Sequence, residues 1–241
     1  LVEKCRAECD RAVVSVFVNP TQFNDPNDLK NYPRTEEADL ALLEKTGVDY
    51  VLMPSVEDIY PQKDTRVFDL GTTDKTMEGA HRPGHFNGVA QVVSRLFDIV
   101  RPERAYFGEK DFQQIAVIRE MVRRYGYPVQ IVACPIVRGA DGLALSSRNA
   151  LLTPAHRAAA PTIYGALNEN AAAARTMSVE EFRRRVVERI DATKLLKTEY
   201  LSVVHAETLE EIDTWSDSFP MRCCIAVQAG DIRLIDNIAI A

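Results

Sequence analysis

The sequence lacks two features that would assign it to a class at once. No stretch approaches the roughly 20 apolar residues that a membrane-spanning helix needs. There is also no excess of positive charge, because 29 Lys and Arg residues stand against 35 Asp and Glu residues and give a formal net charge of -6. Nucleic acids and anionic membranes attract a basic surface, so we expect neither as a partner. An anionic ligand would have to bind in a locally positive pocket.

Cysteine is scarce and forms no recognisable pattern. The five thiols are an odd number, with neither a Cys-x-x-Cys pair nor a histidine at ligand spacing: Cys5, Cys9, Cys134, Cys223 and Cys224. This argues against a disulfide framework and a zinc site, and it predicts reduced thiols and a cytoplasmic protein. The first residues, LVEKCRAECD, resemble the middle of an amphipathic helix, so we expect further residues before Leu1.

What is present is a globular composition. The 241 residues are 46% apolar and 27% charged, which is typical of a soluble protein with either one large domain or a large and a small one.

The first half alternates two kinds of segment. Short apolar runs predict strands at 12–18, 49–54, 105–107 and 129–137. Apolar residues at helical spacing predict helices at 35–47, 87–100 and 111–125. This alternation predicts an α/β fold with a Rossmann-like, doubly wound parallel sheet, whose ligands bind at the carboxyl ends of the strands.

The second half has a different pattern. A basic helix is predicted at 178–190, followed by strands at 199–204, 222–228 and 232–236. We therefore expect a Rossmann-like domain over residues 1–136 and a smaller α+β domain with an antiparallel sheet over residues 137–241.

Four polar segments lie at predicted strand ends or in loops. The first two are VNPTQF (18–23), with the amides of Asn19 and Gln22, and HRPGHFNGV (81–89), with Arg82 and His85 before a helix N-terminus that can attract an anion. Each also has an interpretation without a function. VNPTQF is then only an Asn-Pro turn, and the histidines of HRPGHFNGV are only solvated loop residues.

The other two segments have the same ambiguity. FGEKDFQQ (107–114) offers Gly108 and Lys110 to a phosphate, and it places Gln114 on the apolar face of the following helix, where a buried amide needs a partner. Asp111 is also a plausible helix cap. GLALSSRN (142–149) offers hydroxyls and a guanidinium to phosphate oxygens, or is a capped turn with a surface arginine.

Together with NDLKNYPRT (27–35), these four segments occur in an order that resembles the pantoate-beta-alanine ligase family, over essentially the whole chain. The resemblance implies a Rossmann-type domain followed by a smaller one, and usually a homodimer. It implies that the carboxylate of pantoate attacks the α-phosphate of ATP in the presence of Mg²⁺, and that beta-alanine then displaces AMP from the pantoyl adenylate.

The resemblance also implies roles for individual residues. Gln22 and Gln114 would hold pantoate with Asn19 nearby. Arg82 and His85 would form a gate over the phosphates and take part in catalysis. Asp39 would be a magnesium ligand. The implied ATP contacts are Gly108, Glu109, Lys110, Asp111, Val137, Leu145, Ser146, Ser147 and Arg148. Of these, Lys110 and the Ser146–Arg148 loop would also take part in catalysis, the loop being carried onto the triphosphate when the small domain closes.

One part of the family pattern has no counterpart here. The family begins with a strand and a Met-Gly-Ala-Leu-His-x-Gly-His motif, whose histidines help to bind ATP, and this chain starts just after it. We therefore expect residues 1–241 alone to adenylate pantoate slowly.

Two alternatives stay open at this point. Another enzyme of the nucleotidyl-transferase superfamily, to which the resembled family belongs, would keep the phosphate contacts but lack the pair Gln22 and Gln114. A cytidylyltransferase or a different carboxylate-activating ligase would be such an enzyme. A catalytically impaired nucleotide-binding fragment would bind ATP without turnover.

Overall fold

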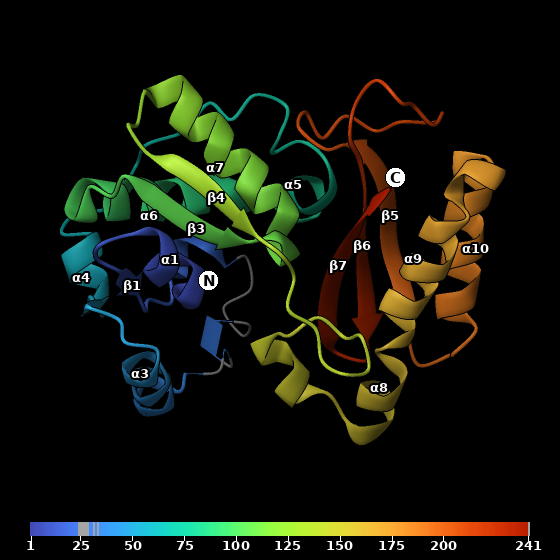
Figure 1. Ribbon diagram of the computed structural model, residues 1–241, viewed down its shortest axis with the longest axis horizontal. Coiled ribbons are helices and arrows are strands. Elements are labelled where there is room, and N and C mark those ends of the chain that lie inside the picture. Colours follow the sequence, from blue (N-terminus) through green and yellow to red (C-terminus); the bar gives the residue numbers. More distant parts are fainter. Residues whose placement is uncertain (24–28, 31, 33, 241) are drawn as a thin grey trace. The chain divides into compact units, whose positions relative to one another are not determined.

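A computed structural model describes residues 1–23, 29, 30, 32 and 34–240 (Figure 1). Part of NDLKNYPRT therefore lies outside the described residues. The chain divides into two compact units. The first comprises Leu1–Asp74, Glu78–Gly108 and Val117–Cys134, and the second comprises Lys75–Met77, Glu109–Ala116 and Pro135–Ala241. The boundary predicted between residues 136 and 137 lies close to the end of the first unit at Cys134 and stays a prediction.

The first unit alternates strands and helices. Its strands are β1 (Val13–Ser15), β2 (Tyr50–Leu52), β3 (Arg104–Gly108) and β4 (Gln130–Cys134). Its short helical elements are α1 (Val2–Glu8), the 3-10 turn η1 (Pro20–Gln22) and α4 (Val56–Ile59). The longer helices are α3 (Glu36–Lys45) and α6 (His85–Val100), and α5 (Met77–His81) and α7 (Phe112–Tyr125) contribute residues to both units.

The strands of this unit pair in parallel. β1 pairs with β2 from Val13↔Tyr50 to Ser15↔Leu52, and β3 pairs with β4 from Arg104↔Gln130 to Gly108↔Cys134. Among the described residues these pairs form separate two-stranded sheets. Both β1 and β3 line a cavity of about 870 Å³, together with residues of α1 and α6. Val13 is 41% exposed although it lies in the apolar run that predicted this strand.

The core of the first unit lies between α6 and α7. Side chains from one face of each helix, including Val89, Phe97, Ile118 and Met121, are buried in one cluster. Ala105, Phe107 and Ile131 from β3 and β4 pack against it. The helical spacing of apolar residues in the sequence therefore predicted this core correctly.

One helix of this unit differs from its prediction. The helix predicted at 35–47 from its apolar spacing is present as α3, but of Ala38, Leu40, Leu42 and Leu43 only Leu43 is buried, and Leu42 is 61% exposed. Its N-cap, Thr35, does not cap the helix through a side-chain bond to the backbone, because its hydroxyl donates to Asp39 Oδ1 at 3.2 Å.

The second unit contains an antiparallel sheet of three strands in the order β5-β6-β7. These strands are β5 (Lys197–His205), β6 (Met221–Ala229) and β7 (Ile232–Ile240). The helical elements of the unit are η2 (Glu109–Asp111), η3 (Ser147–Leu151), α8 (Pro154–Ala159), α9 (Thr162–Ala172), η4 (Ala174–Thr176) and α10 (Val179–Asp191). The predicted basic helix and antiparallel sheet are both present, with strands longer than predicted.

Two helices of this unit pack against the sheet. Figure 1 shows α9 and α10 side by side next to the sheet. α9 contacts β7, and α10 contacts β5. Phe182, Val186 and Ile190 of α10 and Ile225 and Val227 of β6 lie in one buried cluster. Ser178 caps α10 by accepting a hydrogen bond from the backbone of Glu181. This sheet supplies a rigid support for residues on its surface.

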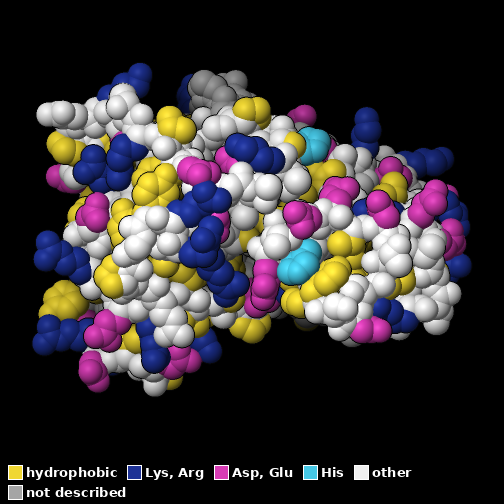
Figure 2. Space-filling view, turned by 90° about the horizontal axis from the view of Figure 1, so that it is seen from above, with side chains coloured by type: hydrophobic (Ala, Val, Ile, Leu, Met, Phe, Trp, Pro, Cys, Tyr) yellow, Lys and Arg dark blue, Asp and Glu magenta, His cyan; other side chains and the backbone are white. Residues whose placement is uncertain are grey.

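The surface has a mixed charge. Figure 2 shows acidic side chains beside basic ones over the face drawn. Searching the described residues finds no helix with the length and apolar character to cross a bilayer.

Candidate active site

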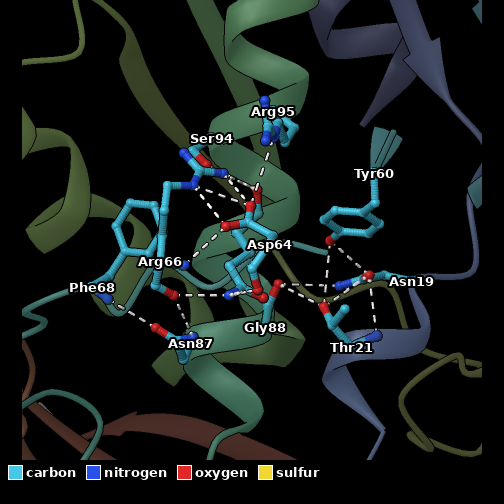
Figure 3. A network of polar contacts seen from close by, with 11 residues as sticks. Asn19, Thr21, Tyr60, Asp64, Arg66, Phe68, Asn87, Gly88, Ser94 and Arg95 are labelled. Atoms are coloured by element: carbon cyan, nitrogen blue, oxygen red, sulfur yellow. Dashed lines mark hydrogen bonds and ion pairs between the residues drawn. The ribbon is translucent and has the colours of Figure 1, made fainter. Parts of the chain in front are cut away.

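In the first unit, the VNPTQF segment forms the 3-10 turn η1 with Asn19 as its N-cap. The Asn19 side chain accepts from Thr21 N at 3.3 Å and from the Tyr60 hydroxyl at 2.9 Å, and its Nδ2 donates to Gly88 O at 3.1 Å (Figure 3). Asn19 is only 2% exposed. Its amide therefore supports the turn, and its place near pantoate stays a prediction.

Gln22 at the end of η1 is held by its backbone. Its carbonyl oxygen accepts from His85 Nδ1 at 2.8 Å and from Arg82 Nη2 at 3.3 Å. A carbonyl only accepts, so His85 carries a proton on Nδ1, and Nε2 can accept from Arg82 Nη1 at 3.2 Å. Arg82 also pairs with Glu78 at 3.6 Å. The structure thus brings together Gln22, Arg82 and His85, three of the predicted site residues.

The side-chain amide of Gln22 is less constrained than its backbone. Its closest described partner is Asn19 Nδ2, 3.5 Å from Oε1, which is at the limit of a hydrogen bond. A half-buried amide with one long contact can exchange that contact for a ligand hydroxyl or carboxylate.

The turn and α6 meet at Gly88. A Cβ atom on Gly88 would lie 2.4 Å from the Thr21 carbonyl oxygen and 3.0 Å from Gln22 N. Only glycine allows the backbone of η1 to approach the helix this closely. The sequence places Gly88 near the start of the helix predicted at 87–100. A glycine inside a helical pattern indicates a packing or a functional reason without saying which.

A second network holds the beginning of α6 and was not predicted. Asn87 accepts from Phe68 N at 2.8 Å and donates to Arg66 O at 3.1 Å (Figure 3). The side chain of Asp64 is 2% exposed and pairs with Arg66 at 2.5 Å and with Arg95 at 3.6 Å. The hydrogen bonds from Arg66 lower the pKa of Asp64 below its ordinary value, against the opposing effect of burial. These contacts fix the helix that carries His85 and Gly88.

In the second unit, η2 carries Lys110. The Lys110 ammonium lies 3.8 Å from Asp111 Oδ1, and its side chain is 22% exposed. The preceding Glu109 pairs with Arg222 of β6 at 2.9 Å. The expected helix cap, Asp111, is instead the last residue of η2, and Gly108 is the last residue of β3. Lys110 is therefore a partly exposed cation on a well-anchored turn.

The burial of Gln113 and Gln114, two neighbouring residues of α7, differs from the prediction. Gln113 is the buried one, 5% exposed, and it donates to Thr76 O at 2.8 Å. Gln114 is half-buried and forms no side-chain hydrogen bond to another described residue. The argument that a buried amide needs a partner thus applies to Gln113. Gln114 keeps an amide that can bind a ligand.

Residues 137–145 form a short hairpin before the SSRN segment. Arg138 and Ala144 are paired in an isolated bridge, and Leu145 N donates to Val137 O at 3.0 Å. Val137 is 64% exposed and Leu145 is 57% exposed. Two exposed apolar side chains on paired backbones offer a surface that a flat, apolar ring such as adenine can cover.

The SSRN segment itself is a capped turn. The Ser146 hydroxyl accepts from Arg148 N at 3.3 Å and caps η3, which contains Ser147 and Arg148. The structure therefore has the capped turn that the sequence offered as one interpretation of this segment. A capped turn also leaves the Ser147 hydroxyl exposed, so the two interpretations are compatible.

Asp39 was the residue predicted to bind magnesium. It lies in the first turn of α3, where its carboxylate accepts from Thr35. In the described part of the chain, no group of three or more His, Cys, Asp or Glu side chains is arranged to hold a metal ion. The described residues do not fit a magnesium site made by the protein alone, and the assignment of Asp39 to magnesium stays a prediction.

Comparison with known proteins assigns the chain. The family model described as pantoate-beta-alanine ligase matches residues 1–239. The chain belongs to the pantoate-beta-alanine ligase family. It is 56% identical to the pantothenate synthetase of Porphyromonas gingivalis over 99% of this chain and 85% of that protein.

Solved structures of the pantoate-beta-alanine ligase family have the same fold. Pantothenate synthetase from Thermus thermophilus matches with a TM-score of 0.94 at 47% identity, over 100% of this chain and 87% of that one. The ligase from Francisella tularensis, complexed with beta-gamma ATP and beta-alanine, matches with a TM-score of 0.83 at 34% identity, over 99% and 83%. The predicted Rossmann-like fold with a second, smaller domain is thereby confirmed.

Proposed function

We propose that this chain condenses pantoate with beta-alanine in an ATP-dependent reaction that passes through a pantoyl adenylate. The observation that supports it most directly is the family match, which extends over residues 1–239. A structural relative complexed with beta-gamma ATP and beta-alanine supports the same substrates. In this proposal, pantoate's carboxylate attacks the α-phosphate and pyrophosphate leaves. The amine of beta-alanine then attacks the acyl carbon and AMP leaves.

Most of the groups that such a reaction needs at the nucleotide would come from the second unit, and Gly108 would come from the end of β3. A carboxylate and a triphosphate repel each other, so the site must neutralise charge where it develops. Lys110 and Arg148 are cations suited to phosphate oxygens, and Ser146 and Ser147 add neutral donors. Val137 and Leu145 would contact the adenine, and Gly108, Glu109 and Asp111 would flank the nucleotide.

The glutamines are proposed to bind pantoate. Gln22 presents an amide with one long contact, and Gln114 presents one without a described partner. Both are neutral, so they can donate to a carboxylate and accept from a hydroxyl without adding a charge. Asn19, Arg82 and His85 would act on pantoate indirectly, because their hydrogen bonds fix the backbone of the Gln22 turn.

Magnesium enters this proposal with ATP rather than with the protein. Mg²⁺ in nucleotide sites usually binds substrate phosphates with only one or two carboxylates from the protein. We assign no step to it.

Replacing Gln22 by Ala tests the assignment. We expect the KM for pantoate to rise by about tenfold or more, because a polar site that loses a partner rejects its substrate strongly. ATP binding should be unchanged. Calorimetry with ATP, together with pantoate-dependent exchange of pyrophosphate into ATP, measures both. Gln130, an exposed glutamine of β4 in the same unit, provides the matched control as Gln130→Ala.

The same assays separate the alternatives. A cytidylyltransferase would exchange pyrophosphate into CTP without pantoate. An impaired nucleotide-binding fragment would bind ATP but release no AMP when beta-alanine is added. If Gln22→Ala weakened ATP binding alone, the assignment of Gln22 to pantoate would be wrong.

We also propose a cytoplasmic homodimer, as the family resemblance implies. Sedimentation equilibrium should then give twice the chain mass of 27.0 kDa. A single-chain mass at micromolar concentration would contradict it.

A further inference from the structure

We propose that two adjacent residues of β7, Asp236 and Asn237, are positioning residues for ATP. Each holds one of the two nucleotide-binding segments assigned to the second unit, Glu109–Lys110 and the hairpin 137–145. This inference rests on the proposed function, since it concerns how those segments are held in place. Neither residue was a candidate in the sequence, where Asp236 is the last residue of the strand predicted at 232–236 and Asn237 follows it.

Asn237 holds the turn that carries Lys110. Its Nδ2 donates to Glu109 O at 2.8 Å and to Lys110 O at 3.1 Å. Its Oδ1 accepts from Arg222 Nε at 2.7 Å. The residue is 2% exposed, so these bonds form away from solvent. The two donated hydrogen bonds tie η2 to β7, and the accepted one ties β7 to Arg222 of β6.

The chemistry of its partners requires an amide at this position. Two carbonyl oxygens only accept and an arginine Nε only donates, so the side chain must offer donors on one side and an acceptor on the other. Asparagine does so, whereas aspartate would direct a negative oxygen at two carbonyls. Arg222 also pairs with Glu109 Oε2 at 2.9 Å and lies over the Phe112 ring, which surrounds the turn with fixed contacts.

Asp236 holds the hairpin. Its two oxygens accept from Arg138 Nη1 at 2.7 Å and Nη2 at 2.9 Å, a bidentate pair. Asp236 is 4% exposed, and its Oδ1 also accepts from Asn237 N at 2.7 Å. Arg138 in turn donates to Gly142 O at 3.2 Å and lies 3.7 Å from the centroid of the Tyr164 ring.

Arg138 connects Asp236 directly to the proposed adenine contacts. It follows Val137 in the chain, and the backbone of Val137 bonds to Leu145. Ser146 comes next. An arginine fixed by a buried carboxylate therefore sets the position of the hairpin from which the Ser146–Arg148 turn begins.

The support behind these two residues is rigid. β7 pairs with β6 along its whole length, with Asp236 opposite Ile225 and Asn237 opposite Cys224. Loss of either attachment would let a nucleotide segment move relative to the sheet. Displacements of about 1 Å at a reacting group can cost a hundredfold in rate, so the effect should be visible in ATP use.

The test compares Asn237→Asp with wild type and with Ser202→Ala. Ser202 is a buried polar residue of β5, 5% exposed, whose hydroxyl bonds to Glu211, so it controls for loss of a polar contact elsewhere in the sheet. For Asn237→Asp we expect the Kd and KM for ATP to rise by about tenfold or more, with the KM for pantoate unchanged. Arg138→Lys, which keeps the charge but loses the bidentate geometry, should show the same selectivity for ATP. Ser202→Ala should leave both KM values unchanged.

Each result has a defined meaning. If the wild-type protein binds no ATP, the proposed function is wrong, and the positioning role is wrong with it. If wild type binds ATP and both folded variants bind it equally well, the positioning role is overturned. A parallel rise in both KM values would also overturn it, since that would indicate a general structural effect. Failure of both variants to fold, judged by thermal unfolding, would mean that these contacts serve folding and would overturn it as well.

Discussion

At the scale of single residues, Gly88 shows two opposing effects. Glycine inside a helix costs about 0.5–1 kcal/mol relative to alanine, so Gly88→Ala would stabilise an isolated α6. In the folded chain, the added methyl would lie 2.4 Å from the Thr21 carbonyl oxygen. Relieving such a contact costs about 1–3 kcal/mol, so the unfavourable effect should be the larger.

We therefore predict that Gly88→Ala displaces the Gln22 turn. The KM for pantoate should rise by about fivefold or more, given the few kcal/mol involved, while ATP binding is retained. Steady-state kinetics and calorimetry measure the two quantities. Gly165→Ala in α9 is a suitable control, because the closest atom to its added Cβ is 3.6 Å away. A more stable Gly88→Ala variant with unchanged kinetics would show that the turn does not depend on this contact.

Residue types were easier to predict than their surroundings. The sequence identified Gln22, His85 and Arg82 as candidates, and the structure joins them through one carbonyl oxygen. It misjudged Gln113 and Gln114, because neighbouring positions in a helix differ by only about 100° and the burial of each depends on what packs there. Tyr60 was missed for a related reason, since nothing in the sequence indicates that it reaches Asn19.

At the scale of elements, the hairpin 137–145 depends on one backbone conformation. Gly142 has φ +86°, a left-handed value, and a Cβ there would lie 2.7 Å from Tyr164 Cδ1. A residue with a side chain pays about 1–2 kcal/mol for that conformation alone. The hairpin therefore requires glycine at this position.

We predict that Gly142→Ala lowers the melting temperature and raises the KM for ATP together. The strain would shift the hairpin that carries Val137 and Leu145. Ser178→Ala serves as the control, because loss of the α10 cap costs about 1 kcal/mol without touching a proposed ATP contact. If both variants lost the same stability and both kept the wild-type KM for ATP, the conformation of the hairpin would not affect nucleotide binding, and the prediction would be wrong.

The helices and strands themselves were predicted where burial follows a simple period. One face of α6 and one face of α10 are buried, and β6 is buried over nearly all of its length. The apolar patterns of these segments predicted this burial. The pattern failed at α3, where Leu40 and Leu42 are exposed, and at β1, which is shorter than its apolar run. An apolar run shows that burial is favourable but does not identify the surface that covers it.

At the scale of the whole molecule, carboxylates held by arginines occur in both units. Hydrogen bonds from Arg123 lower the pKa of Glu120 to about 2, and those from Arg184 lower the pKa of Glu181 to about 2. The pKa of Asp64 is lowered in the same direction by Arg66. A carboxyl with a depressed pKa stabilises the fold above its ordinary pKa, and that stability is lost as the pH falls toward the folded value.

We predict that the stability of both units falls between about pH 4.5 and pH 2. Most of the effect should come from Asp64, because its carboxylate is buried and exposed pairs contribute little. Asp64→Asn should cost about 1–3 kcal/mol at pH 7, and the difference from wild type should shrink near pH 3. Thermal unfolding at several pH values measures this. Asp69→Asn, which removes an exposed partner of Arg124, should have little effect at any pH. A pH-independent difference for Asp64→Asn would contradict the argument.

The cavity beside β1 and β3 gives the chain a built-in chemical reporter. Cys5 and Cys9 line it and are partly exposed, whereas Cys134, Cys223 and Cys224 are buried. A thiol-reactive dye should therefore label at most two sites in the folded chain and five after unfolding. Burial raises the pKa of Cys5, which slows its reaction with the dye at neutral pH. Because Cys5 lines the cavity, its labelling rate should also change when a molecule occupies the cavity.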